Sequence, residues 1–316
     1  MNTGKAHADI ARIALLLREA GLLPPPDGMD IQATRAHLAR IAQFAGKDSI
    51  PLQTEPTLTL PAHTRQVPCK LYWPDKGHAP ALMFYCHGGG FRHGALAGWD
   101  APLRQLVRDS GIAVLSIEYA LAPEYPFPAA FNEVTEVARH IIQHRAIDGR
   151  AVSRFAFGGD SAGANLALGA TIMLRHAGIT SLEHLLLFYG VYSRDTTSES
   201  WRRLGNFNGH GLSADSMRAY WQSYLQQDED DWRVQPINGA LGTLPRTRLV
   251  VGDLDPLVDE NLLLSERLAS VGADAALAVY PGIIHGVLRF NELAPVVRDM
   301  IRTEAEALRD TFFSGV

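Results

Sequence analysis

This chain of 316 residues lacks several features that define other classes of protein. Its only two cysteines, Cys69 and Cys86, are too few for a disulfide framework, so we expect reduced thiols in a cytoplasmic protein. No apolar run approaches the roughly 18 residues of a membrane span, and we expect no membrane contact. The net charge of −5 gives no basic surface, which argues against nucleic acid as a partner.

What the sequence does contain is enough apolar material for a full core, since 47% of its residues are hydrophobic. The apolar stretch from Ile10 to Leu17 is broken and flanked by charges, and it predicts an amphipathic helix over residues 7–20 rather than a signal peptide. A second helix is predicted from Asp30, as its N-cap, to Gly46. Both precede any strand signal, so we expect residues 1–50 to form cap helices over a domain of residues 51–316.

Strand patterns begin after these helices. Alternating apolar and polar residues over 67–73 predict a half-exposed antiparallel strand. Short apolar runs follow, separated in most cases by helical patterns, which is typical of a mostly parallel sheet with helices on both faces. These runs are Ala81–Cys86, Ile112–Tyr119, Arg154–Phe157, Leu185–Tyr189, Arg248–Val251 and Ala275–Tyr280. The fold class predicted is therefore α/β, with a mostly parallel sheet.

A serine stands between the third of these runs and a helical pattern. It is the centre of the segment Gly159-Asp160-Ser161-Ala162-Gly163. On so sharp a strand-to-helix turn the serine backbone is strained, its neighbours two positions away must be almost free of side chain, and the hydroxyl is exposed above the sheet. This pattern is typical of a nucleophile, with the Ala162 N–H as an oxyanion donor. A Gly-rich turn with a helix-capping serine is the alternative.

A second glycine-rich stretch, His87-Gly88-Gly89-Gly90-Phe91, follows the first run. Three consecutive glycines allow backbone N–H groups to face a substrate oxygen with no side chains in the way, as an oxyanion hole requires. A flexible turn is the alternative. The stretch is not a dinucleotide fingerprint, because that pattern would need a glycine where His93 stands. We predict no cofactor.

Candidates for an acid and a base follow the last two runs. Asp253, Asp255 and Asp259 could each orient a histidine, and Asp255, which a proline follows, is also a good helix N-cap. His285 lies in a short loop and could take the proton of Ser161 and return it to a leaving alcohol. The order Ser, Asp, His along the chain is that of α/β-hydrolases. All four stretches lie at the carboxyl ends of strands, where parallel sheets bind ligands.

Two further histidines, His140 and His144, have the spacing of a metal-binding pair on a helix. The residues between them lack the glutamate of a zinc protease motif, and no third ligand is evident. We interpret them as solvated residues and predict no metal site.

Taken together, these residues resemble those of the hormone-sensitive-lipase group of α/β-hydrolases, which are esterases with HGGG and GDSAG motifs, and within it bacterial acetyl esterases. The resemblance covers most of the chain from residue 67 and includes segments 119–124 and 187–190. It implies Gly89 and Gly90 as oxyanion donors beside Ala162, and it selects Asp255 over its two rivals. Residues that support the motifs are His87, Gly88, Gly159, Asp160 and Gly163. Arg92 and His93 depart from the apolar residues that relatives more often carry.

These observations predict a serine carboxylesterase for short acyl groups, acetyl to about butyryl, working through an acyl-enzyme. Ser161 would be the nucleophile, His285 the base and then the acid, and Asp255 the residue that orients His285. One alternative is a hydrolase of amides, formamides or lactones with the same triad, and another is a non-catalytic ligand-binding or regulatory protein. The expected partner is a small ester molecule, and a homodimer is compatible with the sequence.

The long segment from Tyr192 to Gly242 does not follow the strand-helix rhythm. It is rich in arginine, aspartate and aromatic residues, and we predict a mostly helical excursion, with residues 192–242 forming a second cap insertion in the catalytic domain. Its aromatic side chains are expected to pack within this cap, with one or two lining an acyl pocket. They are Trp201, Phe207, Trp221, Tyr224 and Trp232.

Overall fold

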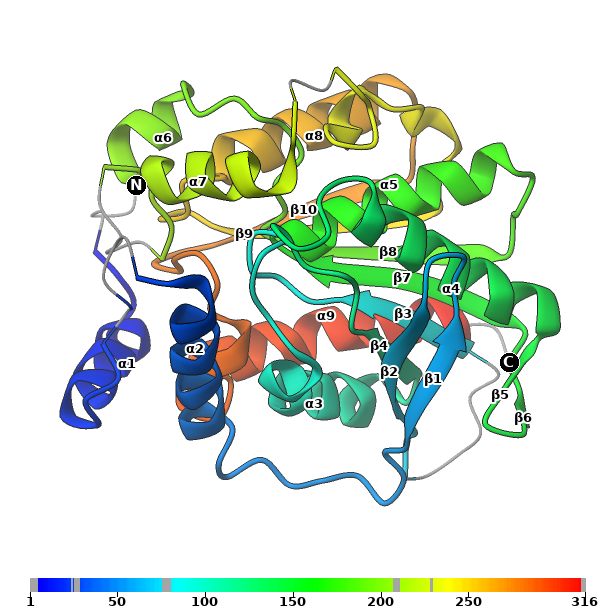
Figure 1. Cartoon of the computed structure of the whole chain (residues 1–316), viewed down its shortest axis with the longest axis horizontal. Helices are drawn as coiled ribbons and strands as arrows, with labels where there is room; N and C mark the ends of the chain where they lie inside the picture. The colour runs from blue at the N-terminus through cyan, green and yellow to red at the C-terminus, as the bar shows by residue number, and fades with distance from the viewer. Residues whose placement is uncertain are drawn as a thin grey trace.

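The chain folds around an eight-stranded sheet, described by a computed structural model for residues 5–23, 25, 29–75, 81–206, 211–227 and 230–313 (Figure 1). From edge to edge the strands are β1 (Thr57–Pro61), β2 (Gln66–Tyr72), β4 (Ala113–Ile117), β3 (Ala81–Cys86), β7 (Arg154–Asp160), β8 (Leu182–Phe188), β9 (Arg246–Gly252) and β10 (Ala275–Tyr280). β2 pairs antiparallel with both of its neighbours, and all other pairs are parallel. The predicted α/β class and mostly parallel sheet are confirmed.

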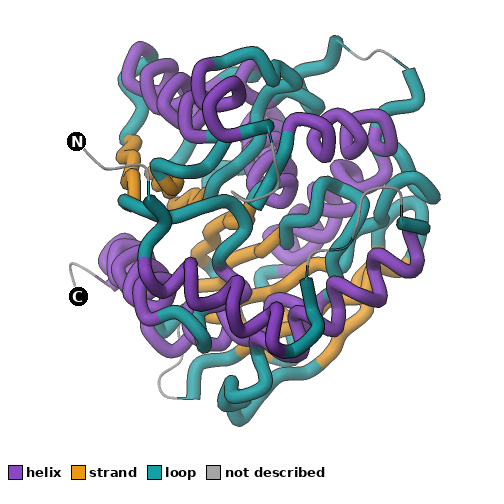
Figure 2. The backbone as a smooth tube through the Cα atoms, turned by 90° about the vertical axis from the view of Figure 1, so that its left-hand side faces the viewer, coloured by secondary structure: helices purple, strands orange, loops and turns teal. Residues whose placement is uncertain are grey.

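Helices cover both faces of the sheet, and each face has its own apolar core (Figure 2). Helices α3 (Asp100–Ser110) and α9 (Pro295–Phe313) lie on one face. The other face carries α4 (Ala129–His144), α5 (Ala162–His176) and α8 (Val258–Ser270). Because successive strand residues point to opposite faces, a single strand supplies both cores. In β3, for example, Phe84 packs on the α4–α5 side and Met83 on the α3–α9 side.

Two helices precede the sheet, α1 (Ala8–Glu19) and α2 (Ile31–Ala45), at the left of Figure 1. The predicted N-cap of the second helix is confirmed, since Asp30 Oδ1 accepts hydrogen bonds from the Gln32 N–H at 2.9 Å and the Ala33 N–H at 3.1 Å. Gly46 ends that helix as predicted. No helix within the described ranges is long and apolar enough to cross a lipid bilayer.

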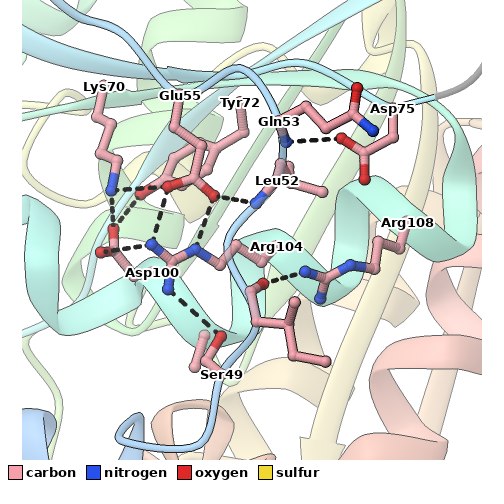
Figure 3. Close-up of polar contacts among 12 residues, drawn as sticks. Ser49, Leu52, Gln53, Glu55, Lys70, Tyr72, Asp75, Asp100, Arg104 and Arg108 are labelled. Carbon is pink, nitrogen blue, oxygen red and sulfur yellow. Dashed lines mark hydrogen bonds and ion pairs between the residues drawn. The ribbon is translucent and has the colours of Figure 1, made fainter.

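Partly buried ion pairs hold the segment that links α2 to β1 (Figure 3). Glu55 accepts hydrogen bonds from the Arg104 guanidinium at 2.7 and 2.8 Å and lies 3.2 Å from Lys70 Nζ. The Asp100 carboxylate in turn accepts from Lys70 at 2.8 Å and from the Tyr72 hydroxyl at 2.6 Å. Burial alone would raise the pKa of Glu55, but the hydrogen bonds from Arg104 and a backbone N–H, with the charges of Arg104 and Lys70, lower it to about 2. This cluster ties the linking segment to α3 and β2.

The strands missing from the sequence predictions are short or exposed, and the long helix α9 after the last strand was not predicted either. β1 was not predicted because its residues lie at the sheet edge and alternate between exposed and half-buried. The hairpin of β5 (Ala146–Ile147) and β6 (Arg150–Ala151) was not predicted because each strand has only two residues.

The prediction of a mostly helical 192–242 segment is wrong. Its described residues form α6 (Glu199–Leu204), α7 (Ala214–Tyr224) and the short 3-10 turns η3 (Pro236–Asn238) and η4 (Leu241–Thr243), and loops make up the rest. Side chains hold these loops, as where Arg194 N–H donates to Gln235 Oε1 at 3.0 Å.

Candidate active site

Four polar stretches meet at one edge of the sheet, at the carboxyl ends of β3, β7, β9 and β10. β3 leads into residues 87–91, β7 into Ser161, β9 into Asp255 and β10 into His285. β3 and β7 are neighbours, as are β9 and β10, and β8 lies between the two pairs. This arrangement places residues that are far apart in the sequence on a common rim, where ligands of parallel sheets bind.

The turn from β7 to α5 holds Ser161 in an unusual backbone conformation, with φ of 55° and ψ of −120°. A non-glycine residue in this region is strained, and strain of this kind persists only where surrounding structure holds it. The Ser161 N–H donates to the Phe188 carbonyl at 2.9 Å. The turn also depends on its glycines, because a Cβ at Gly159 would lie 2.5 Å from the Gly163 backbone and one at Gly163 would overlap the Cys86 carbonyl. The chain can therefore make this turn only with glycine at both positions.

The structure brings the predicted serine, histidine and aspartate together. His285 Nε2 lies 3.0 Å from Ser161 Oγ, and His285 Nδ1 lies 2.8 Å from Asp255 Oδ2. Asp255 is completely buried, whereas 9% of His285 is exposed. Because the carboxylate faces Nδ1, the proton of a neutral imidazole sits on Nδ1, and Nε2 is free to accept the serine proton. The Tyr189 ring packs edge-on against His285, with the ring centroids 5.0 Å apart.

The two rival carboxylates are engaged elsewhere. Asp253 Oδ1 accepts from the Gly282 N–H at 2.6 Å, and Asp259 Oδ2 accepts from the Ser200 N–H at 2.7 Å. The hydrogen bonds therefore show that Asp255, and neither Asp253 nor Asp259, is the carboxylate that faces His285, which sequence spacing could not decide.

Asp255 does not act as the helix N-cap, so that prediction is wrong. Helix α8 begins at Val258 with Leu257 as its N-cap. Asp255 Oδ1 instead accepts from the Leu257 N–H at 2.9 Å, within the turn that precedes the helix. This bond holds the carboxylate while its other oxygen faces His285.

The glycine loop after β3 offers backbone N–H groups beside the serine. Gly89 and Gly90 have φ of 122° and 59°, and their N–H groups donate to no other described residue. Ala162 is the first residue of α5, where N–H groups have no partner one turn earlier in the helix. Gly89, Gly90 and Ser161 line one cavity together. The predicted oxyanion donors are thus placed near the serine without competing partners.

Asp160 links the glycine loop to the serine turn. Its Oδ1 accepts from the Gly88 N–H at 2.9 Å and from the Tyr85 hydroxyl at 3.0 Å, and its Oδ2 accepts from the Tyr189 hydroxyl at 3.4 Å. Burial raises the pKa of Asp160, while the charge of Arg289 and the hydrogen bonds from Tyr85 and the Gly88 N–H act in the opposite direction. Asp160 thus has a positioning role that the motif alone does not reveal.

His87 fills the space beneath the same loop. Its Nδ1 lies 2.9 Å from the Gly88 carbonyl, and its ring stacks on Tyr119 at 4.4 Å between centroids. Burial lowers the pKa of His87 to about 4, so the ring is neutral at neutral pH. The Tyr119 hydroxyl donates to the His87 carbonyl at 2.7 Å and fixes the loop from below.

A cavity of about 1120 Å³ opens above Ser161 and His285. Its wall includes side chains of α1 and α2 and, from the 192–242 segment, Leu212 and Tyr220. None of the described aromatic residues predicted for a pocket lines it, and Phe207 lies outside the described residues. The reason is helical spacing: Met217, Trp221 and Tyr224 of α7 face the interior, so Tyr220 faces the cavity.

Several residues of this site were not found from the sequence. The hydroxyls of Tyr85 and Tyr189 donate hydrogen bonds to Asp160 from neighbouring parts of the sheet. Tyr220 and Arg289 line the cavity from two elements that are far apart in the sequence. Tyr189 lies in segment 187–190, which is part of the family resemblance, and His93 departs from the family pattern, but neither signal pointed to a role in the site. His140 and His144 stack at 4.1 Å between ring centroids on α4, and no group of three metal-ligating side chains forms among the described residues.

The chain is similar to known esterases and to a family model of the alpha/beta hydrolase fold. A family model of the alpha/beta hydrolase fold matches residues 83–289. An acetyl esterase of Salmonella choleraesuis (strain SC-B67) is 31% identical over 304 residues, which cover 94% of this chain and 93% of that protein. A hyperthermophilic esterase from the archaeon Pyrobaculum calidifontis superposes with a TM-score of 0.89 at 27% identity, covering 97% and 98% of the two chains. The ester hydrolase EH1AB1 from the Lake Arreo metagenome also gives a TM-score of 0.89 at 27% identity, covering 97% and 99%. The chain therefore belongs to the hormone-sensitive-lipase-type family of α/β-hydrolases and is a carboxylic ester hydrolase.

Proposed function

We propose that this esterase hydrolyses short acyl esters, acetyl to about butyryl, through a Ser161–His285–Asp255 triad and an acyl-enzyme. The observation that carries the proposal is the continuous hydrogen-bond chain, with 3.0 Å from Ser161 Oγ to His285 Nε2 and 2.8 Å from His285 Nδ1 to Asp255 Oδ2. A serine activated by a base that a buried carboxylate orients is the general arrangement of nucleophilic acyl transfer.

In the proposed reaction, Ser161 Oγ attacks the ester carbonyl while its proton passes to His285 Nε2. Asp255 stabilises the imidazolium that forms. The N–H groups of Gly89, Gly90 and Ala162 hold the oxyanion, and each such donor typically contributes about 3 kcal/mol at the transition state. His285 then gives its proton to the leaving alcohol. A water molecule, deprotonated by the same nitrogen, hydrolyses the acyl-enzyme and restores the serine.

The short-chain preference is supported by the acetyl esterase relatives. The cavity is larger than an acetyl group needs, so its volume does not by itself limit the acyl chain. A series of p-nitrophenyl esters from acetate to dodecanoate tests this part of the proposal. A kcat/KM that is highest between acetate and butyrate supports it, and a maximum at octanoate or beyond contradicts it.

The test of the nucleophile is Ser161→Ala, assayed with p-nitrophenyl acetate. We expect kcat to fall by about 10⁴-fold or more, because the triad acts as a unit. The matched control is Ser270→Ala, which removes an exposed hydroxyl whose one hydrogen bond within the described ranges is to the Arg267 carbonyl at 2.7 Å, and it should retain full turnover. Near-normal turnover by Ser161→Ala would remove this serine from the mechanism.

Residues 1–50 and 192–242 are proposed to act as caps over this site, since both contribute to the wall of its cavity. A substrate panel that includes amides, formamides and lactones will show how far the activity extends beyond esters. A cytoplasmic location stays a prediction from the sequence, for cell fractionation to check.

A further inference from the structure

Among the described residues, one half-buried cation in the wall of the active-site cavity has no ion-pair partner. Lys47 also lines the cavity without an ion pair, but it is exposed and lies over the Phe44 ring. Arg289, in the turn η5 (Leu288–Phe290), is half-buried and stacks over the Trp99 ring, 5.1 Å from its centroid. It makes no side-chain hydrogen bond or ion pair with any residue in the described part of the chain. Arg35 and Arg104 line the same cavity, but carboxylates hold both of them. Arg289 therefore offers its N–H groups to whatever occupies the cavity.

No acidic group in the described part of the chain forms an ion pair with this arginine. The charge of Arg289 acts on Asp160, but that carboxylate already accepts from two tyrosine hydroxyls and one backbone N–H. Asp100 also lines the cavity and accepts from Lys70 at 2.8 Å. Glu118 is the other carboxyl of the wall, and the charge that acts on it is that of Arg65 rather than that of Arg289. The positive charge is thus left without a direct partner.

A second polar group in the same wall is also unsatisfied. His93 is 6% exposed and packs edge-on against Tyr220, and its Nδ1 is buried with no hydrogen-bond partner among the described residues. A proton on Nδ1 would be a buried donor without an acceptor, which is costlier than a bare acceptor nitrogen. The proton of the neutral ring therefore belongs on Nε2, the nitrogen that is not buried. Burial, with the charges of Arg92, Arg35 and Arg289, lowers the pKa of His93 to about 4, so the ring is neutral at neutral pH.

We propose that the cavity selects esters that carry a carboxylate, with Arg289 binding that carboxylate and His93 Nε2–H donating a hydrogen bond to it. The proposal rests on ester hydrolysis at Ser161. A planar guanidinium with free N–H groups matches a carboxylate in shape as well as charge. The carboxylate can come from the acid part, as in a monoester of a small dicarboxylic acid, or from the alcohol part, as in an acetylated hydroxy acid.

Matched pairs of substrates test the selectivity. Monoethyl succinate against ethyl succinamate places the charge on the acid part, and 3-acetoxypropanoate against 3-acetoxypropanamide places it on the alcohol part. In at least one pair we expect the carboxylate ester to have the higher kcat/KM by about tenfold or more, the usual strength of a hydrogen-bonded charge pair. The pair that shows the preference tells whether the carboxylate belongs to the acid part or to the alcohol part of the ester. Equal values, or a preference for the amide in both pairs, overturn the proposal.

Arg289→Gln separates recognition from a merely structural role. If Arg289 binds the carboxylate, the ratio of the two kcat/KM values falls toward one, whatever change in turnover the two esters share. Arg289→Lys should keep part of the ratio. If Arg289 only balances the buried charge of Asp160, both esters slow equally and the ratio is unchanged, which contradicts the proposal. The control is Arg92→Gln, since the charge of Arg92 also reaches His93 but its side chain does not line the cavity, and the ratio should stay within about twofold.

A binding measurement keeps this test independent of catalysis. In Ser161→Ala protein, tryptophan fluorescence, to which Trp99 contributes, reports binding of monoethyl succinate and of ethyl succinamate without turnover. The same measurement with 3-acetoxypropanoate and its amide covers the alcohol side. Tighter binding of a carboxylate ester that is lost in Ser161→Ala/Arg289→Gln supports the anion site even if the nucleophile proves to be another residue. Equal binding within both pairs overturns it, even if ester hydrolysis at Ser161 is established.

Discussion

Replacing Asp255 by asparagine would test the triad by changing a single proton position. The carboxylate is completely buried, with Oδ2 at 2.8 Å from His285 Nδ1 and Oδ1 at 2.9 Å from the Leu257 N–H. Asparagine has the same shape, and its oxygen can still accept from Leu257. Its NH₂ group would then face Nδ1 and donate to it. The imidazole proton would move to Nε2, and Nε2 could no longer accept the proton of Ser161.

The expected loss follows from this tautomer change. The same substitution in a serine-protease triad lowers kcat by about 10⁴-fold, and we expect a similar loss of kcat/KM for p-nitrophenyl acetate in Asp255→Asn. That loss corresponds to about 5 kcal/mol of transition-state stabilisation. The fold should persist, since volume and the bond to Leu257 are retained, and circular dichroism with thermal unfolding checks this.

The rival carboxylates supply matched controls. Asp253→Asn and Asp259→Asn remove a charge from the same region but keep an oxygen for the N–H groups of Gly282 and Ser200. We expect both to retain kcat/KM within about tenfold, as for the loss of one charge-assisted hydrogen bond. The assignment is refuted if folded Asp255→Asn keeps activity within that range, or if one of the controls loses as much as Asp255→Asn.

Two further predictions concern stability and the glycine loop. The low pKa of Glu55, about 2 against an ordinary 4.5, means that its charged form stabilises the fold above about pH 4.5 and that this stabilisation is lost as the pH falls toward 2. Glu55→Gln should therefore lower the free energy of unfolding at neutral pH by at most about 3 kcal/mol, and by much less at pH 3, as measured by urea unfolding. A deficit that is the same at both pH values would contradict the contribution of the charge. Gly90→Ala should lower kcat by about 10-fold to 1000-fold, because φ is 59° there and a Cβ would overlap the Tyr220 ring, displacing an oxyanion N–H. Gly90→Ala/Tyr220→Ala should recover part of the loss in the p-nitrophenyl acetate assay, and a Gly90→Ala enzyme with normal kcat would exclude this N–H from the oxyanion hole.

Much of the fold could be predicted because it depends on local patterns. The apolar runs that became β3, β4, β7, β8 and β9 are mostly buried strands, and such runs carry a strong signal. The edge strand β10 is half-exposed, but its residues are also an unbroken apolar run, whereas threonine alternates with leucine in β1. Asp30 and Gly46 marked the ends of α2 through capping that involves only neighbouring residues. β1 had no comparable signal because its residues are exposed or half-buried at the sheet edge.

The candidate site was predictable only in part. The glycines around Ser161 are required by the backbone turn itself, so they appear as a motif. The choice of Asp255 over Asp253 needed either the family resemblance or the tertiary contact with His285, because both aspartates follow the same strand. Arg289 could not be singled out, since its lack of a partner depends on what α1, α2 and the glycine loop place around it.

The most direct test of the mechanism is covalent labelling of the serine. A p-nitrophenyl phosphonate ester would form a bond between phosphorus and Ser161 Oγ, releasing p-nitrophenolate, and the phosphonyl group would remain on the enzyme. We predict that activity falls in proportion to labelling and that mass spectrometry of a digest finds the added mass on the peptide that contains Ser161. Loss of activity with the label on another residue, or full activity with Ser161 completely labelled, would contradict the account.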